Sequence, residues 1–198
     1  MSEEQDYNHY CYIVAGTVGN LTTDLVILHY KLSDPVAKIL LKYCQACGRG
    51  LQKTNIIKDF LDDITRGICY LPNEWLSEVD YTPLSLQGAS SIWKRKVLVD
   101  VLAELKDATE YTIALPYEAV GYRMASLLCL LPALQTILLA AQNQRALFTA
   151  QHPSKISHET FAQCIVDARK LIQDNLGIVG YFQQLENKIN LQFDGYIT

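Results

Sequence analysis

The residues best suited to chemistry lie in the segment QKTNIIKDFLDD, from Gln52 to Asp63. Within it an amide and two carboxylates, Asn55, Asp59 and Asp63, follow one another at intervals of four residues. In a helix, residues four apart share nearly the same face, with Cβ atoms about 5–6 Å apart. Two carboxylates this close repel each other unless a cation lies between them, and Mg²⁺ prefers oxygen ligands and usually also binds substrate phosphates. The spacing therefore indicates a site for Mg²⁺ and a phosphate group.

The surroundings of this stripe predict that it is partly buried. Gln52 and Arg66 extend the stripe at its two ends, and bulky apolar residues flank it: Ile56, Ile57, Phe60, Leu61 and Ile64. Buried carboxylates must be paired or must coordinate a metal. The alternative is a solvated helix face on which Lys58 and Asp62 form a surface ion pair. The spacing alone leaves both interpretations open.

A second candidate is the tyrosine-rich segment YNHYCYIVAGTVGN, in which Tyr7, Tyr10 and Tyr12 precede three small residues, Ala15, Gly16 and Gly19. Tyrosines that line a cavity can stabilise a carbocation with their ring faces or transfer a proton. The alternative is ordinary packing, because aromatic side chains on a helix more often belong to a core.

Long helices must position these residues. Asp6 can cap a helix to about residue 18, with a bend or close helix contact at Gly16 and Gly19 and a second helix to about residue 31. Ser33-Asp34-Pro35 is a strong start signal for a third helix, because proline suits the first helical position. We expect this helix to continue without interruption to about Arg66 and to carry the polar stripe.

The second half of the chain also predicts helices. Residues 67–88 contain two glycines and two prolines and indicate a loop with a short turn near 74–77. Helices are expected over 90–114, over 117–148 with a kink at Pro132, over 157–175, and from Gly177 to about 192. Asp100 and Glu104 are expected to form a surface pair. Leu127, Leu128, Leu131 and Leu134 are expected to form an apolar pocket wall.

Composition narrows the possible classes of protein. The chain has 198 residues, is about half apolar and has a formal charge of −4, which predicts one all-α domain over residues 1–198 and excludes a basic nucleic-acid-binding surface. The six cysteines indicate reduced, buried thiols in a cytoplasmic protein, and Cys44 and Cys47 lack the second pair that a zinc ribbon needs. The apolar run 124–141 follows Arg123 and contains polar residues, so we expect a core helix in preference to a membrane span.

Several blocks of sequence resemble the squalene and phytoene synthase family. The blocks are YCYIVAGTVG (10–19), GLQKTNIIKDFLDD (50–63), CYLPNEW (69–75) and CLLPALQTI (129–137), and they occur in the family's order. The form QKTNII is closer to the squalene branch. The resemblance implies an isoprenoid-synthase-like helical bundle that joins two prenyl (farnesyl) diphosphates head to head into squalene or a related product. In the squalene branch NADPH then reduces the rearranged cation.

The resemblance also implies roles for individual residues. Asn55, Asp59 and Asp63 would hold Mg²⁺ against a diphosphate, and Tyr10 would act near ionisation and cation control. The substrate contacts would come from Gln52, Lys58 and Arg66. Lys58 stands where the family more often has arginine, so charge is kept but bidentate contact is lost. Leu128 stands where an aromatic residue commonly shields the later cation, which puts the second half-reaction in doubt.

One departure from the family is large. The family has a first acidic motif upstream of the block that begins at Tyr10, and only nine residues precede Tyr10 here. The chain therefore resembles the carboxy-terminal three-fifths of a synthase with N-terminal helices missing. It could be a truncated synthase, a subunit completed by another chain or protomer, or a non-catalytic isoprenoid-binding protein. An exposed cavity wall would favour oligomers or peripheral membrane contact in each case.

Overall fold

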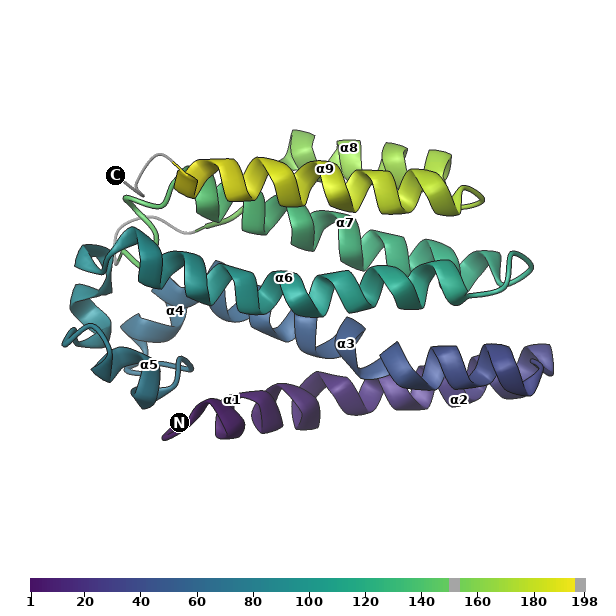
Figure 1. The fold of residues 1–198 in the computed structure, drawn as a ribbon, viewed down its shortest axis with the longest axis horizontal. Coiled ribbons are helices and arrows are strands. Elements are labelled where there is room, and N and C mark those ends of the chain that lie inside the picture. Colours follow the sequence, from purple (N-terminus) through teal and green to yellow (C-terminus); the bar gives the residue numbers. More distant parts are fainter. Residues whose placement is uncertain (150–153, 195–198) are drawn as a thin grey trace.

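The computed structural model is an all-α bundle, and it describes residues 1–149 and 154–194. In Figure 1 the long helices lie roughly side by side along the longest axis, with the short helices α4 and α5 grouped at one end. Helix α3 packs against α6 and α2, and α7 packs against α6, α8 and α9. No strand occurs within the described ranges, which confirms the predicted fold class.

The first helical rod is continuous through Gly16 and Gly19, where a bend or a close helix contact was expected. Helix α1 (Glu4–Cys11) passes through a π-helical segment, η1 (Tyr12–Gly16), directly into α2 (Thr17–Tyr30). A π-helical segment inserts extra residues into a helix without ending it, and such segments are frequent at functional sites. The rod ends at Lys31, which adopts a left-handed conformation with φ 51°.

The third helix is shorter than predicted. Helix α3 (Asp34–Lys58) ends before Asp59, whose backbone leaves helical geometry at φ −99° and ψ 12°, and α4 (Phe60–Thr65) follows at once. Aspartate is a poor helix former that favours helix ends. The four-residue spacing nevertheless survives, because the Asp59 amide donates to the Asn55 carbonyl at 2.8 Å and the Asp63 amide donates to the Asp59 carbonyl at 3.0 Å.

Two glycines let the first helical rod (α1, η1 and α2) and α3 cross with their backbones in contact. A Cβ atom on Gly19 would lie 2.0 Å from the Cys44 carbonyl oxygen, and one on Gly48 would lie 2.1 Å from the Ala15 carbonyl oxygen. Both distances are far too short for any side chain. The close helix contact predicted at Gly19 is therefore present, and Gly48 completes it from α3.

Replacing Gly48 with alanine is expected to destabilise the fold by about 3 kcal/mol, because the two helices must separate to admit one methyl group. Urea unfolding followed by circular dichroism measures this. Gly121→Ala is the matched control, since a Cβ atom on this helical glycine would have nothing within 4 Å, and the change there should stabilise slightly. Equal stability of the two variants would contradict the proposed crossing.

Residues 67–114 follow the prediction closely. Residues 67–88 contain the short α5 (Asn73–Ser77) and a 3₁₀ segment, η2 (Pro83–Gly88). Helix α6 (Ser91–Ala114) begins where expected, with the Ser90 hydroxyl accepting from the Trp93 amide. Helix α7 (Val120–Gln142) is shorter than the predicted 117–148, and Pro132 lies inside it without ending it.

An ionic network around the buried Lys53 joins α3 to α6 and corrects the expected surface pair. The Lys53 side chain is 2% exposed, and its Nζ lies 2.9 Å from Asp100 Oδ1 and 3.2 Å from Glu104 Oε1. Arg49 binds both Glu104 oxygens at 2.8 and 2.9 Å. Burial raises the pKa of Asp100, and Lys53 opposes that shift. Asp100 and Glu104 therefore hold two helices together.

Arg123 is also buried, although its position beside an apolar run suggested a flanking charge. Its guanidinium donates to the carbonyls of Thr112, Leu115 and Ile172 and to Asn175 Oδ1, at distances from 2.6 to 3.1 Å. These acceptors lie near the ends of α6 and α8 and at the start of α9, where helix carbonyls lack intrahelical partners. One side chain thus satisfies backbone groups from several helix ends.

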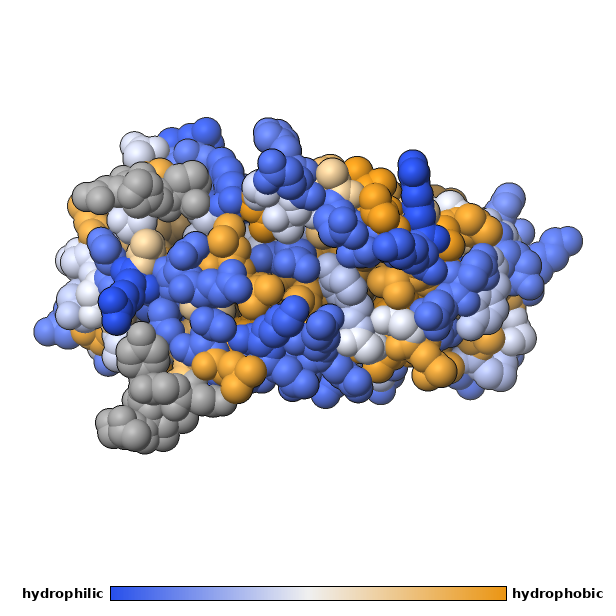
Figure 2. Space-filling model, turned by 90° about the horizontal axis from the view of Figure 1, so that it is seen from above, coloured by the Kyte–Doolittle hydropathy of each residue, from blue (hydrophilic) through white to orange (hydrophobic). Residues whose placement is uncertain are grey.

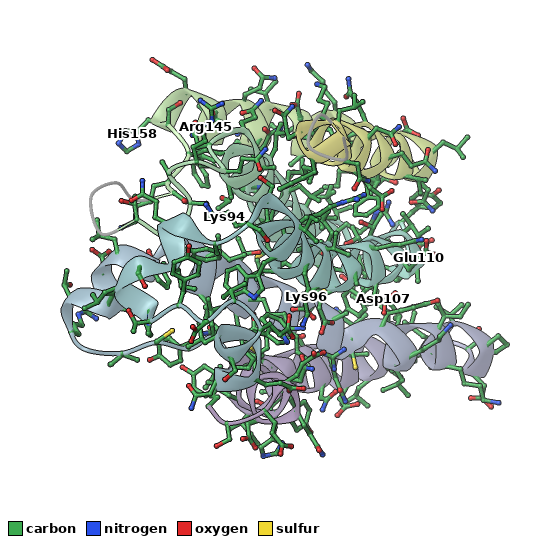
Figure 3. All side chains as sticks on the ribbon, turned by 60° about the vertical axis from the view of Figure 1, so that its left-hand side comes forward. Lys94, Lys96, Asp107, Glu110, Arg145 and His158 are labelled. Atoms are coloured by element: carbon green, nitrogen blue, oxygen red, sulfur yellow. The ribbon has the colours of Figure 1, made fainter. Side chains whose placement is uncertain are left out.

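Helix α8 (His158–Leu171) begins at the predicted cap, with the Ser157 hydroxyl accepting from the Thr160 amide. Helix α9 (Asn175–Asp194) starts two residues before Gly177, so Gly177 does not separate the helices as predicted. The face of the molecule formed by α8 and α9 is mostly hydrophilic with scattered apolar side chains (Figure 2). The labelled Lys94 points into the interior (Figure 3), where its Nζ donates to the carbonyls of Gln87 and Gln144.

Two helices in the described part of the chain are long and apolar enough to cross a membrane, residues 4–30 and 120–142. Length and composition alone are weak support for a span, and a core helix passes the same test. In helix 120–142, 56% of the most apolar stretch is buried inside the protein, as expected for a core helix. In the helical rod 4–30 the corresponding share is 28%.

Candidate functional site

A small polar hollow of about 230 Å³ collects most of the residues singled out by the sequence. It is lined by one residue from α1, four from α3 and its end, one from α4 and one from the segment after α4: Tyr10, Gln52, Asn55, Ile56, Asp59, Asp63 and Tyr70. Tyr10, Gln52, Asn55, Asp59 and Asp63 are thus brought together. Lys58 and Arg66 lie outside the lining.

The charge of Asp59 acts on the other carboxylate of this hollow, Asp63. The pKa of Asp63 is raised, first by burial and then by the negative charge of Asp59, while Arg66 partly offsets both effects. The ionised form of Asp63 is therefore less favoured than that of an exposed aspartate, mainly because the side chain is partly removed from water. Arg66 therefore acts on Asp63 through its charge, although no hydrogen bond joins the two side chains.

The donor set fits a Mg²⁺ ion that shares its coordination with a substrate. No group of three or more histidine, cysteine, aspartate or glutamate side chains is arranged to hold a metal anywhere in residues 1–149 and 154–194. The hollow instead offers two carboxylates and the Asn55 amide oxygen. Mg²⁺ is usually bound by one or two carboxylates, several waters and substrate phosphates, so the residues present suffice for that mode and not for an all-protein cage.

Two lysines lie against the acidic residues. Lys58 Nζ donates to Asn55 Oδ1 at 2.8 Å and lies 3.3 Å from Asp59 Oδ2, so the alternative Lys58–Asp62 pair is wrong. Lys155, from the segment between α7 and α8, lies 2.9 Å from Asp62 Oδ2 and 3.5 Å from Asp59 Oδ1. No pattern in the sequence indicated that Lys155 would lie here.

Tyr10 has an aromatic partner in the hollow. Its ring stacks on that of Tyr70, with centroids 5.1 Å apart and planes tilted by 21°. Burial and the hydrogen bond with Tyr70 raise the pKa of Tyr10 to about 12. The hydroxyl therefore stays protonated at neutral pH and can donate a hydrogen bond. Tyr70 was missed as a candidate, although it belongs to the family-like block CYLPNEW.

An apolar cavity of about 240 Å³ lies further along the same side of α3. Gly48 and Leu51 of α3 line it, followed along the helix by Gln52, Asn55 and Asp59 of the polar hollow. Gly48 and Asp59 are eleven positions apart, which corresponds to about 16 Å along a helix. One face of α3 therefore presents first an apolar cavity and then an acidic hollow.

The wall of this cavity differs from the predicted one. Helix α7 contributes Ala125, Ser126, Cys129 and Leu130 to the lining. The predicted residues pack elsewhere: Leu127 and Leu131 are buried against α8 and α9 with Leu128 beside them, and Leu134 belongs to the main core. Helix α7 is apolar on all sides, so its pattern could not indicate which side faces the cavity.

The predicted burial of the thiols holds for Cys11, Cys44 and Cys164, whereas Cys129 is exposed. All six thiols are free, and burial raises the pKa of Cys11 and Cys47 to about 12. Reactive cysteines need the opposite shift, toward the thiolate. Cys47 and Cys129 both line the apolar cavity, where they act as small hydrophobic side chains.

Comparison with known proteins identifies relatives of one kind. The sequence model of the family described as squalene/phytoene synthase matches residues 1–164. The squalene synthase of Cyberlindnera jadinii is 30% identical over 175 residues, which is 84% of this chain and 38% of that protein. The bifunctional lycopene cyclase/phytoene synthase of Arthroderma gypseum is 39% identical over 85 residues, covering 42% of this chain and 14% of the relative.

A solved structure shares the fold. The complex of TcSQS with the ligand BPH1237 superposes with a TM-score of 0.79 at 21% identity, over 100% of this chain and 57% of that one. This chain thus spans well under two thirds of the length of these relatives.

Proposed function

Because this chain belongs to the squalene/phytoene synthase family, we propose that it binds prenyl diphosphates and takes part in joining two of them head to head. The observation that carries the proposal is the arrangement along α3 of an apolar cavity followed by an acidic hollow. A prenyl diphosphate has the same two parts, an apolar tail and an anionic head that binds carboxylates only through a cation.

In this proposal Asn55, Asp59 and Asp63 hold Mg²⁺, which neutralises the charge that develops on a departing diphosphate. Lys58 is close enough to add a second positive charge, and Gln52 offers a hydrogen-bonding amide at the rim. Tyr10 presents a protonated hydroxyl and, with Tyr70, an aromatic face beside the reacting carbon, where ring electrons stabilise a cation. Arg66 contributes through its charge.

The apolar cavity supplies what the allylic cation requires after diphosphate leaves. Leu51, Leu105 and Leu130 line it, and Ser126 and Thr22 are among its few polar residues. An apolar wall limits capture of the cation by water. The tail of the substrate would lie here, with its first carbon directed toward Tyr10 and Asp59.

Filling the cavity tests this placement. Ala125→Trp is expected to weaken binding of a non-hydrolysable farnesyl diphosphate analogue by at least about tenfold, because the tail loses its buried surface. Inorganic pyrophosphate, which has no tail, should bind equally well to the variant and the parent protein. Calorimetric titrations in Mg²⁺ buffer measure both affinities. Ala162→Trp, at an exposed position on α8, is the control. Equal loss for both ligands would contradict the placement.

Product analysis separates catalysis from binding. Incubation with farnesyl diphosphate and Mg²⁺, with and without NADPH, should give a C30 hydrocarbon only if the chain, alone or with a partner, completes the reaction. The exposed apolar residues of α2 favour a partner: Val18, Leu21 and Leu28 are 54%, 60% and 76% exposed. Binding without turnover would support the alternative of a non-catalytic isoprenoid-binding subunit.

A further inference from the structure

Lys155 pairs with an aspartate of the acidic hollow from a distant part of the sequence. It reaches Asp59 and Asp62 from the segment that joins α7 to α8, more than ninety positions away. In Figure 1 the described residues of this connection, 143–149 and 154–157, lie at the same end of the bundle as α4, and Figure 3 labels Arg145 among them. The positive charge of Lys155 therefore reaches Asp59 from a segment that is separate from α3 and α4.

Asp59 lies at the centre of two ion pairs. Its Oδ2 lies 3.3 Å from the Lys58 ammonium and its Oδ1 lies 3.5 Å from the Lys155 ammonium. A divalent ion bound to Asp59 would have to share these oxygens with two cations. The Lys155 side chain is 47% exposed, and exposed ion pairs contribute little stability. A divalent ion can therefore displace Lys155 from Asp59 at a small cost in free energy.

Asp62 keeps Lys155 near the hollow after such a displacement. The Lys155–Asp62 contact is the shorter of the two, at 2.9 Å, and Asp62 is not part of the lining of the hollow. Lysine is a compact charge on a flexible four-carbon stem with three donors, so it can turn from one anionic partner to another while it stays paired with a third.

We propose that Lys155 is a further substrate-contacting residue that exchanges partners, leaving Asp59 when Mg²⁺ binds and then donating to the incoming diphosphate. The proposal rests on the function proposed above. It adds the Lys155 ammonium as a substrate contact, and it states that this ammonium leaves Asp59 before it binds the diphosphate. In the metal-free protein Lys155 opposes binding of a lone divalent ion. Once the diphosphate is present, the same charge favours the ternary assembly.

The exchange predicts changes of opposite sign in one variant. Lys155→Gln should bind Mn²⁺ alone about two- to fivefold more tightly, as expected when one weak ion pair is removed. The same variant should bind inorganic pyrophosphate in Mg²⁺ buffer about tenfold more weakly, as expected for one lost hydrogen bond to a charged group. Electron paramagnetic resonance of free Mn²⁺ measures the first affinity and calorimetry measures the second.

Lys170→Gln is the matched control, because Lys170 is an exposed lysine of α8 paired only with Asp167 of its own helix among the ion pairs of the described residues. It should change neither affinity. If the parent protein binds no pyrophosphate with Mg²⁺, the proposed function fails. If the parent binds it but Lys155→Gln leaves both affinities unchanged, or shifts both in the same direction, the partner exchange is refuted and the proposed function stands.

Discussion

Replacing Asp59 and Asp63 together by asparagine is expected to abolish the Mg²⁺-dependent stabilisation of the protein by a farnesyl diphosphate analogue. In the parent protein, ligand at a hundredfold excess over Kd should raise the free energy of unfolding by about 2.7 kcal/mol. The double variant keeps the shape of both side chains but loses the two negative charges that hold the metal. Thermal unfolding with Mg²⁺ and the analogue, together and separately, measures the effect.

The unliganded double variant should be at least as stable as the parent protein. Because burial and the charge of Asp59 raise the pKa of Asp63, its ionised form is disfavoured in the folded state at neutral pH. A neutral amide removes that cost. Asp24→Asn with Glu159→Gln removes the same number of charges from exposed positions and should leave ligand stabilisation intact. A shift that persists in the Asp59/Asp63 variant would contradict the metal site.

Replacing Arg123 by methionine should cause a large loss of stability, about 3–5 kcal/mol. Methionine has a similar apolar stem but leaves the carbonyls of Thr112, Leu115 and Ile172 without these donors, and an unsatisfied buried polar group costs about 1–3 kcal/mol. The contributions are not additive, because the helix ends can relax. Urea unfolding measures the loss, and Arg169→Met, an exposed change in α8, should be nearly neutral. A variant as stable as the parent would contradict the role of Arg123.

The sequence predicted best those features that are set by local chemistry. Ser90 and Ser157 marked the starts of α6 and α8 because their hydroxyls cap helix amides, and both caps are present. The four-residue spacing of Asn55, Asp59 and Asp63 predicted one shared helix face, and the three residues line one hollow although the helix is interrupted at Asp59. Their roles in binding metal and substrate remain predictions.

The errors arose where tertiary packing decides the outcome. The apolar pattern of α7 could not show that Ala125 and Leu130, and not Leu127 and Leu131, face the cavity. Asp100 was taken for a surface residue because its partner Lys53 is 47 positions away in the sequence. Lys155 could not be assigned for the same reason. A lone charge beside an apolar run, as at Arg123, is the one signal that could have indicated a buried, partnered side chain.

The π-helical segment Tyr12–Gly16 has a consequence for how this chain tolerates insertions and deletions. It lies between Tyr10, which faces the acidic hollow, and Gly19, which fixes the crossing with α3. Its i→i+5 hydrogen bonds accommodate about one residue more than ordinary α-helical winding, so deleting one residue while restoring that winding would leave the upstream part in nearly the same orientation relative to α2. Tyr10 would then still face Tyr70, and the crossing at Gly19 would stay in place. The same five residues wound as an ordinary α-helix would instead rotate Tyr10 by about the 100° of one residue, so the π-helical winding of this stretch sets the orientation of the tyrosine.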